Sequence, residues 1–336
     1  MDRKKGIGIA GNLIVDHVKM IDRWPEKGML CNISKEYMSI GGCAGNTAVD
    51  LAEIDVSIPL FCYGCTGIDP DGDFVLKELK KRNINTHNVR RMEKTSTSYT
   101  DVMTEKNTGE RTFFQRRGAN AQFLVTDEMI RTMQVKIFHV GYLLLLDRLD
   151  QEDDTYGTVM AGILARIQEK GIKTSVDIVS EQGDRFKEIV TPALRYCNYF
   201  IANEIESGMI TGIEARDESG RLDISRIREI LKAILGKGVK DLAVIHAPEG
   251  GYAMSASGVF EFCPSFRLPK GFIKGSVGAG DAFCAGMLYA LYQDEPVKEA
   301  LEFANLAAAC CLSGEDSVSG MRSLAQMTKL RKELQR

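Results

Sequence analysis

The chain has 336 residues, enough for one large α/β domain or two ordinary ones. Its 44% hydrophobic and 26% charged residues are typical of a globular protein, and a net charge of −3 excludes the basic excess of a nucleic-acid-binding protein. No apolar run reaches membrane-spanning length, and the polar N-terminus lacks a signal-peptide core. We therefore expect a cytoplasmic protein that binds neither nucleic acid nor membrane.

Short β-branched runs alternate with helical patterns along most of the chain. The predicted strands are Ile7–Ala10, Ile58–Tyr63, Ile137–Val140, Thr174–Ile178, Tyr199–Ala202 and Leu242–Ile245. The predicted helices are Asn46–Ile54, Phe74–Lys81, Tyr156–Lys170, Glu204–Ile210, Ile224–Leu235 and Ala282–Tyr292. This alternation predicts an α/β fold with a mostly parallel central sheet and helices on both faces.

Two strand-like regions break the alternation. Met29–Ile40 lacks a following crossover, and Thr95–Thr104 with Arg111–Arg117 predicts a hairpin around Asn107-Thr108-Gly109. We interpret both as one small β-sheet that forms a lid, with a surface extension as the alternative. The predicted organisation is a single α/β domain over residues 1–336, with a lid from roughly 12–40 and 95–118 inserted within it.

The nine cysteines are odd in number and scattered through apolar segments, which favours reduced, buried thiols. Cys62 and Cys65 form a C-x-x-C inside a strand-like run, where packing is a better explanation than a metal or redox site. The glycine pattern from Gly6 to Gly11 matches G-x-G-x-x-G, but no strand precedes it and the segment itself reads as the strand. A dehydrogenase is therefore disfavoured.

The segment Gly275–Asp281 is the most informative in the chain. Gly278, Ala279 and Gly280 open a predicted helix and place a carboxylate in its first turn. The amides of a helix start attract anions, so an acid at that position needs a function. We interpret Asp281 as a general base and the three preceding amides as a hole for a transferring phosphoryl group. An acid placed there to suit the helix dipole is the alternative.

Other polar residues follow predicted strands, at the edge where open α/β sheets bind ligands. Asp16 can accept hydrogen bonds from a polyol, and Asn46 can donate to and accept from the same ligand. Asn203 and Glu206 can hold the hydration shell of Mg²⁺, or they can simply begin a helix.

Together these residues resemble the ribokinase-like (PfkB-type) carbohydrate kinases, over nearly the whole chain. The family's approximate signature D-[ST]-x-G-A-G-D is similar to residues 275–281. Its two glycines followed by an Asn are matched at residues 41–46, and its N-x-x-E at residues 203–206.

The resemblance implies the fold, a phosphotransferase activity and a role for each matched residue. Asp281 is then the catalytic base, and Gly278, Ala279 and Gly280 form the anion hole for the γ-phosphate of ATP. The residues implied to hold the hydroxyls of a small sugar are Asp16, Gly41, Gly42 and Asn46. The residues implied at the nucleotide are Asn203, Glu206, His246, Gly250 and Asn305, with Glu206 organising Mg²⁺ through water.

One departure concerns Gly275, which stands where the family usually has an Asp that helps to bind a monovalent cation, so potassium activation is in doubt. The resemblance also implies that lid sheets can pair into a homodimer.

Three alternatives to a sugar kinase stay open. A nucleoside kinase needs an aromatic platform, which Trp24 and Tyr37 can supply. A phosphosugar kinase needs basic residues at the acceptor, and Arg116 or Arg117 can supply them. A ligand-binding protein without activity is the third, and the intact Gly-Ala-Gly-Asp argues against it.

Overall fold

The computed structural model describes residues 6–179, 183 and 185–334. Its centre is a nine-stranded sheet in the order β15-β14-β13-β12-β11-β8-β1-β4-β5. The strands are β1 (Ile7–Ala10), β4 (Leu60–Gly67), β5 (Asn85–Met92), β8 (Ile137–Leu143), β11 (Lys173–Ile178), β12 (Tyr199–Asn203), β13 (Leu242–Ala247), β14 (Gly250–Ser255) and β15 (Phe260–Pro264). Neighbours from β13 to β5 pair parallel, whereas β14 and β15 pair antiparallel at one edge.

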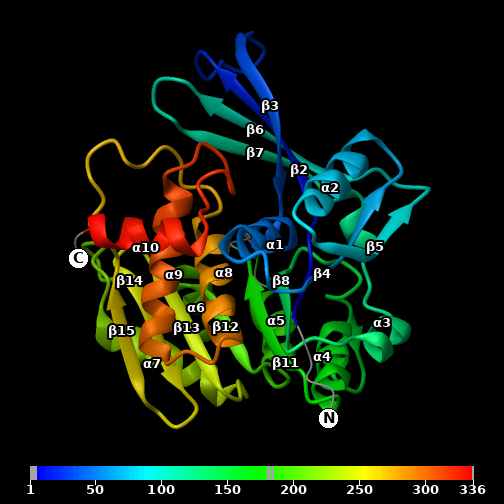
Figure 1. Ribbon diagram of the computed structural model, residues 1–336, viewed down its shortest axis with the longest axis vertical. Helices are drawn as coiled ribbons and strands as arrows, with labels where there is room; N and C mark the ends of the chain where they lie inside the picture. The colour runs from blue at the N-terminus through cyan, green and yellow to red at the C-terminus, as the bar shows by residue number, and fades with distance from the viewer. Residues whose placement is uncertain (1–5, 180–182, 184, 335–336) are drawn as a thin grey trace.

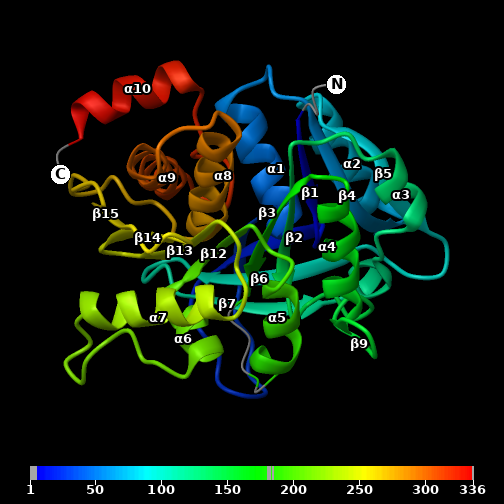
Figure 2. The same ribbon diagram turned by 90° about the horizontal axis from the view of Figure 1, so that it is seen from below.

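Helices cover both faces of this sheet (Figures 1 and 2). One face carries α1 (Cys43–Ile54), α2 (Pro70–Lys81), α8 (Ala279–Tyr292), α9 (Val297–Leu312) and, packed on α9, α10 (Leu324–Glu333). The other face carries α3 (Asp127–Thr132), α4 (Val159–Glu169), α5 (Phe186–Leu194), α6 (Glu204–Thr211) and α7 (Ile224–Gly236). The buried aliphatic side chains of the strands fill the two layers between sheet and helices.

A second, four-stranded sheet projects from the main body at the top of Figure 1. It has the order β3-β2-β6-β7, built from β2 (Ile14–Ile21), β3 (Ile33–Gly41), β6 (Ser98–Glu105) and β7 (Arg111–Arg116). The outer pairs are antiparallel, and β2 and β6 pair parallel. The two segments that break the α/β alternation thus form one small sheet.

The predicted α/β class, with its mostly parallel sheet covered on both faces, is confirmed. Every predicted strand and helix is present, with ends that move by up to four residues. The edge hairpin of β14 and β15 was not predicted, because two glycines begin β14 and dilute its strand pattern. A short hairpin, β9 (Glu152–Asp153) with β10 (Gly157–Thr158), precedes α4, which starts where the Thr158 side chain caps the amide of Ala161.

All nine cysteines are free thiols, and all but Cys31 are buried, as the sequence predicts. None of the helices in the described part of the chain is long and apolar enough to cross a membrane.

Candidate active site

The order in which the chain adds strands to the central sheet reverses at β1. The chain adds β4 and β5 on one side of β1, then returns to add β8, β11, β12 and β13 on the other. Such a switch point leaves a crevice beyond the carboxyl ends of the strands, where open α/β sheets bind ligands. Asp16, Gly41, Gly42 and Asn46 lie around the start of α8 in this region, whereas Gly250 and Asn305 lie toward β14, β15 and α9.

Asp281 lies in the first turn of α8 and is only 4% exposed. Its Oδ2 accepts hydrogen bonds from Asn46 Nδ2 at 2.7 Å and from the Tyr142 hydroxyl at 3.2 Å. Burial raises the pKa of Asp281 to about 6, against the lowering effect of these two hydrogen bonds. The carboxyl is therefore poised to exchange a proton near neutral pH, as a general base must.

The start of α8 requires glycine at its N-cap. Gly278 has φ +81°, a left-handed conformation, and a Cβ there would lie 2.5 Å from the Ser317 carbonyl oxygen. Ala282 N–H is bonded to the Gly278 carbonyl at 2.8 Å, so the regular helix ladder begins only there. Ala279 N–H donates to the Ser276 carbonyl oxygen at 3.4 Å, whereas the amides of Gly280 and Asp281 precede that ladder at the helix end, a position that favours anions.

The start of α1 stands opposite α8. Gly42 is its N-cap with φ +78°, and a Cβ there would lie 2.4 Å from the Asn12 carbonyl oxygen. Asn46 is fixed at both ends of its amide, because its Oδ1 accepts from the Ser317 hydroxyl at 2.9 Å while its Nδ2 donates to Asp281. This arrangement orients the Asp281 carboxyl and leaves Asn46 less free to contact a ligand than the sequence suggests.

Asp16 reaches the same crevice from the small sheet. It lies inside β2 rather than in a loop after the first strand, which corrects the prediction, and its carboxyl lies against the backbone of Gly41 at the end of β3. Burial, together with the negative charge of Asp281, raises the pKa of Asp16 to about 7. Two carboxyls with raised pKa values thus border one space.

Strand pairing defines which side chains share the face of Asp16. Asp16 pairs with Ser39 and Thr100, and Thr100 pairs with Gln115, so every second residue from these positions shares one face. The inner face includes Asp16, Val18, Lys35, Tyr37, Ser39, Thr100, Val102, Thr104, Arg111, Phe113 and Gln115.

The strand pairing places a different arginine on the face of Asp16 from the two that the sequence suggested. Arg116 pairs with Tyr99 on the opposite face, and Arg117 binds Asp147 and the Leu144 carbonyl instead. Arg111 is the arginine on the inner face, and its Nη2 donates to the Glu315 carbonyl at 3.0 Å. Trp24 lies beyond the far end of the β2–β3 pair, whereas Tyr37 is on the inner face.

Asn203 and Glu206 begin α6 at the carboxyl end of β12. Asn203 Oδ1 accepts from the Glu206 amide at 2.8 Å, and Glu206 Oε2 accepts from the Asn203 amide at 3.0 Å, which is a reciprocal capping box. Asp177, at the end of β11, lies near both Glu206 and Asp281. Burial, then the charges of these two acids, raises the pKa of Asp177 well above its usual range.

The other residues that the resemblance assigns to the nucleotide lie near β13, β14 and α9. The His246 ring packs against Phe283 of α8 at a tilt of 34°, with ring centroids 4.9 Å apart, and lies beside Gly280. Burial lowers the pKa of His246 to about 4. Gly250 begins β14 after the turn that follows β13. Asn305 Nδ2 donates to the carbonyl oxygens of Cys263 and Pro264, at 2.9 and 3.3 Å, and so ties α9 to β15.

The sequence did not predict Tyr142, Ser317, Asp177 or Arg111 as parts of this site. The signal for Tyr142 is structural, because it has φ +58°, a conformation rare for a bulky residue and concentrated at functional sites. Burial, then the Asp281 charge, raises the pKa of Tyr142 well above its usual range, which keeps its hydroxyl a hydrogen-bond donor to Asp281.

The family model for pfkB carbohydrate kinases matches residues 10–323, nearly the whole chain. The chain belongs to the pfkB family of carbohydrate kinases. It is therefore a phosphotransferase whose acceptor is a hydroxyl group, and the crevice between α8 and the small sheet is where this kinase is expected to act.

Relatives in sequence cover the kinase almost end to end. A ribokinase of Schizosaccharomyces pombe is 24% identical over 326 residues, covering 96% of each chain. An ATP-dependent ribose-1-phosphate kinase of Halopiger xanaduensis is 27% identical over 311 residues, covering 92% of this chain and 93% of that one.

Solved structures share the fold of the kinase. The ribokinase of Arabidopsis thaliana, determined with ribose and ATP, superposes with a TM-score of 0.80 at 19% identity, covering 98% and 99% of the two chains. A nucleoside kinase of Methanocaldococcus jannaschii superposes with a TM-score of 0.73 at 16% identity, with the same coverage. One fold thus serves relatives with different named acceptors.

Proposed function

We propose that this kinase transfers the γ-phosphate of ATP to a hydroxyl of a small carbohydrate, with Asp281 as the catalytic base. One observation carries the proposal. The Asp281 carboxyl is buried, has a pKa raised to about 6, and directly follows the three residues whose amides open α8. A base and an anion hole on the same helical turn are what phosphoryl transfer to an alcohol requires.

Each group around the crevice has a defined task in this mechanism. Asp281 takes the proton of the acceptor hydroxyl, while Asn46 and Tyr142 hold its carboxyl in place. The amides of Gly278, Ala279 and Gly280 stabilise the negative charge on the transferring group. Asp16, with the backbone of Gly41 and Gly42 around it, holds other hydroxyls of the acceptor and so aligns the reacting one.

The nucleotide is assigned to the side of α6, β13 and α9. The assigned residues are Asn203, Glu206, His246, Gly250 and Asn305. Asp177, Glu206 and Asp281 crowd acidic oxygens together at the carboxyl ends of β11 and β12, which fits a hydrated Mg²⁺, with Glu206 acting through water. Mg²⁺ would supply neutralisation of phosphate charge, and the side chains would orient its waters.

The small sheet is assigned as a lid over this crevice, within a single α/β domain. Its inner face carries Asp16, so closure of the sheet would bring the acceptor toward Asp281 and exclude water. The edge strands β3 and β7 are largely exposed. Pairing of lids into a homodimer stays a prediction, as does a cytoplasmic location.

No dependence on a monovalent cation is expected. A Cβ at Gly275 would lie 3.2 Å from Arg111 Nη2 and 3.0 Å from the Gly314 carbonyl oxygen. The guanidinium of Arg111 thus places a fixed positive charge beside this loop, where it donates to the Glu315 carbonyl.

A phosphorylated sugar is the second candidate acceptor, and Arg111 is the observation that favours it. Arg111 shares the inner face with Asp16 and lowers the pKa of Asp16 against the larger effect of burial. Lys35 and Tyr37 line a cavity of about 440 Å³ between β3 and residues 313–319, and Lys274 lies at its rim. A nucleoside stays the third candidate, because Phe113, 53% exposed, and Tyr37 are aromatic rings on the inner face.

A panel assay tests the proposal and chooses the acceptor. ADP release from Mg-ATP is measured with sugars, sugar phosphates and nucleosides, in potassium and in choline buffers. We expect turnover on one sugar class, equal in the two buffers. Turnover only on nucleosides, or normal ATP binding without turnover on any hydroxyl compound, would contradict the carbohydrate assignment. A much higher rate in potassium than in choline buffer would contradict the role of Arg111.

The pH profile should report the raised pKa of the base. Because the pKa of Asp281 lies above its ordinary value, its carboxylate form is lost as the pH falls through about 6. We expect kcat at saturating acceptor to be constant above neutral pH and to fall tenfold per pH unit once the pH is below the apparent pKa, whereas kcat/KM for the acceptor should also reflect Asp16, whose pKa is raised to about 7. An acid limb only near pH 4 would show that the base is an ordinary solvated carboxyl or another group.

A further inference from the structure

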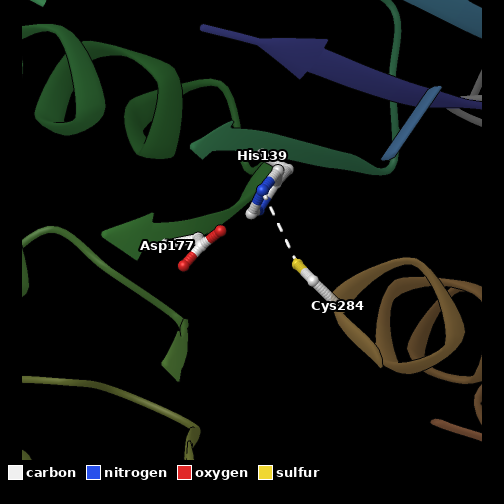
Figure 3. Close-up of side chains that lie close together, drawn as sticks. All are labelled: His139, Asp177 and Cys284. Atoms are coloured by element: carbon white, nitrogen blue, oxygen red, sulfur yellow. Dashed lines mark hydrogen bonds between the residues drawn. The ribbon is translucent and has the colours of Figure 1, made fainter. Parts of the chain in front are cut away.

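A compact group of metal-binding side chains lies beneath the start of α8. His139 comes from β8, Asp177 from the end of β11 and Cys284 from α8, one turn after Asp281. One ligand atom from each lies within 4.8 Å of the other two. Figure 3 shows the His139 ring and the Cys284 sulfur facing each other, with the Asp177 carboxyl beside them. We propose that His139, Asp177 and Cys284 bind a soft divalent metal ion such as Zn²⁺.

The distances suit a single ion. His139 Nε2 and Cys284 Sγ are 3.7 Å apart. A tetrahedral ion with Zn–N and Zn–S bonds of about 2.0 and 2.3 Å separates two such ligand atoms by roughly 3.5 Å. Small shifts of the three side chains would therefore bring their ligand atoms to bonding distance of one ion, with water in the fourth position.

The orientation of His139 also fits a ligand. Its Nδ1 is 3.1 Å from the Ser175 hydroxyl, which leaves Nε2 facing Cys284. A hydrogen bond at the far nitrogen is the usual way in which a metal-binding imidazole is held.

The donor set distinguishes this site from the Mg²⁺ position near Glu206. Imidazole and thiolate select zinc-like ions, whereas Mg²⁺ takes oxygen ligands and keeps its waters. Zn²⁺ would displace the thiol proton of Cys284 and hold Asp177 as a carboxylate. Asp177 is 7% exposed while His139 and Cys284 are 0% and 1% exposed, so the ion would enter from the crevice.

An ion at this position would join β8, β11 and α8 just behind the catalytic turn. It would also bind the carboxylate of Asp177, which lies near Glu206. We therefore expect Zn²⁺ to lower kinase activity. That consequence rests on the proposed function, whereas binding of the metal does not.

Cobalt spectroscopy tests the site without relying on activity. The metal-free full chain is titrated with Co²⁺ in a Cys31→Ser background, because Cys31 is the one partly exposed thiol. We expect a thiolate-to-cobalt charge-transfer band and the visible bands of tetrahedral Co²⁺, saturating at one ion per chain and abolished by Zn²⁺.

Matched variants then identify the ligands. Cys284→Ser should remove the charge-transfer band, and His139→Gln should weaken Co²⁺ affinity by more than about 100-fold, beyond the loss expected for a residue outside the ligand shell. Ser175→Ala, which removes only the partner of Nδ1, should weaken affinity by about 10-fold. Cys310→Ser, at an equally buried thiol in α9, should change nothing.

Two results would overturn the proposal. One is the absence of a charge-transfer band in a protein with normal folding. The other is a band that persists in Cys284→Ser, which would place the metal at another cysteine. If Cys284→Ser does not fold, the His139→Gln titration decides the matter in the same way.

Discussion

Replacing Asp281 with Asn is expected to lower kcat by a factor of about 10²–10⁴, the usual contribution of a general base. The amide has nearly the same shape as the carboxyl and can still accept hydrogen bonds from Asn46 and Tyr142, which reach Oδ2 in the native protein. It cannot take a proton from the acceptor hydroxyl. Initial rates with saturating Mg-ATP and acceptor measure the effect.

The melting temperature of Asp281→Asn shows whether the loss of kcat comes from unfolding. Burial raises the pKa of Asp281, so at neutral pH the folded protein carries a charge that burial disfavours, and the neutral amide should leave the melting temperature unchanged or higher. Asp73→Asn is the matched control, because it removes an acid from the first turn of α2 without touching the crevice. A kcat that stays within a few-fold of wild type would move the base to another residue.

Replacing Asp16 with Asn is expected to lower kcat/KM for the acceptor by about 10–100-fold, because a hydrogen bond to a charged group contributes about 1.5–3 kcal/mol. Asp16 holds hydroxyls in both the bound acceptor and the transition state, so most of the loss should appear in the KM of the acceptor. The KM of ATP should not change. Steady-state kinetics with each substrate varied in turn measure both constants.

Asp101→Asn is the control for this change. Asp101 belongs to the same small sheet but pairs with His17 on the opposite face, where it binds Lys19. A higher KM for ATP with an unchanged KM for the acceptor would place Asp16 at the nucleotide instead.

Local patterns were enough to predict most of the fold. β-branched runs that alternate with amphipathic segments determine a parallel α/β sheet, because each strand must be covered on both faces. The exceptions follow the same logic. β14 begins with Gly250 and Gly251, whose lack of side chains weakens its strand pattern, so the antiparallel edge was not predicted.

Contiguous motifs made part of the site predictable, and distance along the chain hid the rest. Gly278 to Asp281 are consecutive and lie on one helical turn, so the sequence alone predicts that they act together. Asn46 meets Asp281 across 235 positions and Ser317 across 271, and no local pattern pairs them. Tyr142 has an ordinary strand sequence around it, and only the backbone shows its left-handed conformation.

The arginines of the small sheet show a different limit. The strand from Arg111 to Arg117 was predicted close to its observed bounds. Successive side chains of a strand, however, point to opposite faces of the sheet. A one-residue uncertainty in register exchanges the two faces, so the sequence could not say that Arg111 and not Arg116 faces Asp16. Only the pairing of β2 with β6 and of β6 with β7 decides this.

Transfer of label from γ-³²P-ATP is the most direct test of the central claim. The wild-type enzyme is incubated with Mg-ATP and the acceptor selected by the panel, and the products are separated into phosphorylated acceptor and inorganic phosphate. The account predicts label in the phosphorylated sugar, with transfer reduced by about 10²-fold or more in Asp281→Asn. Label found only in inorganic phosphate, or transfer to the sugar that is unaffected by Asp281→Asn, would contradict it.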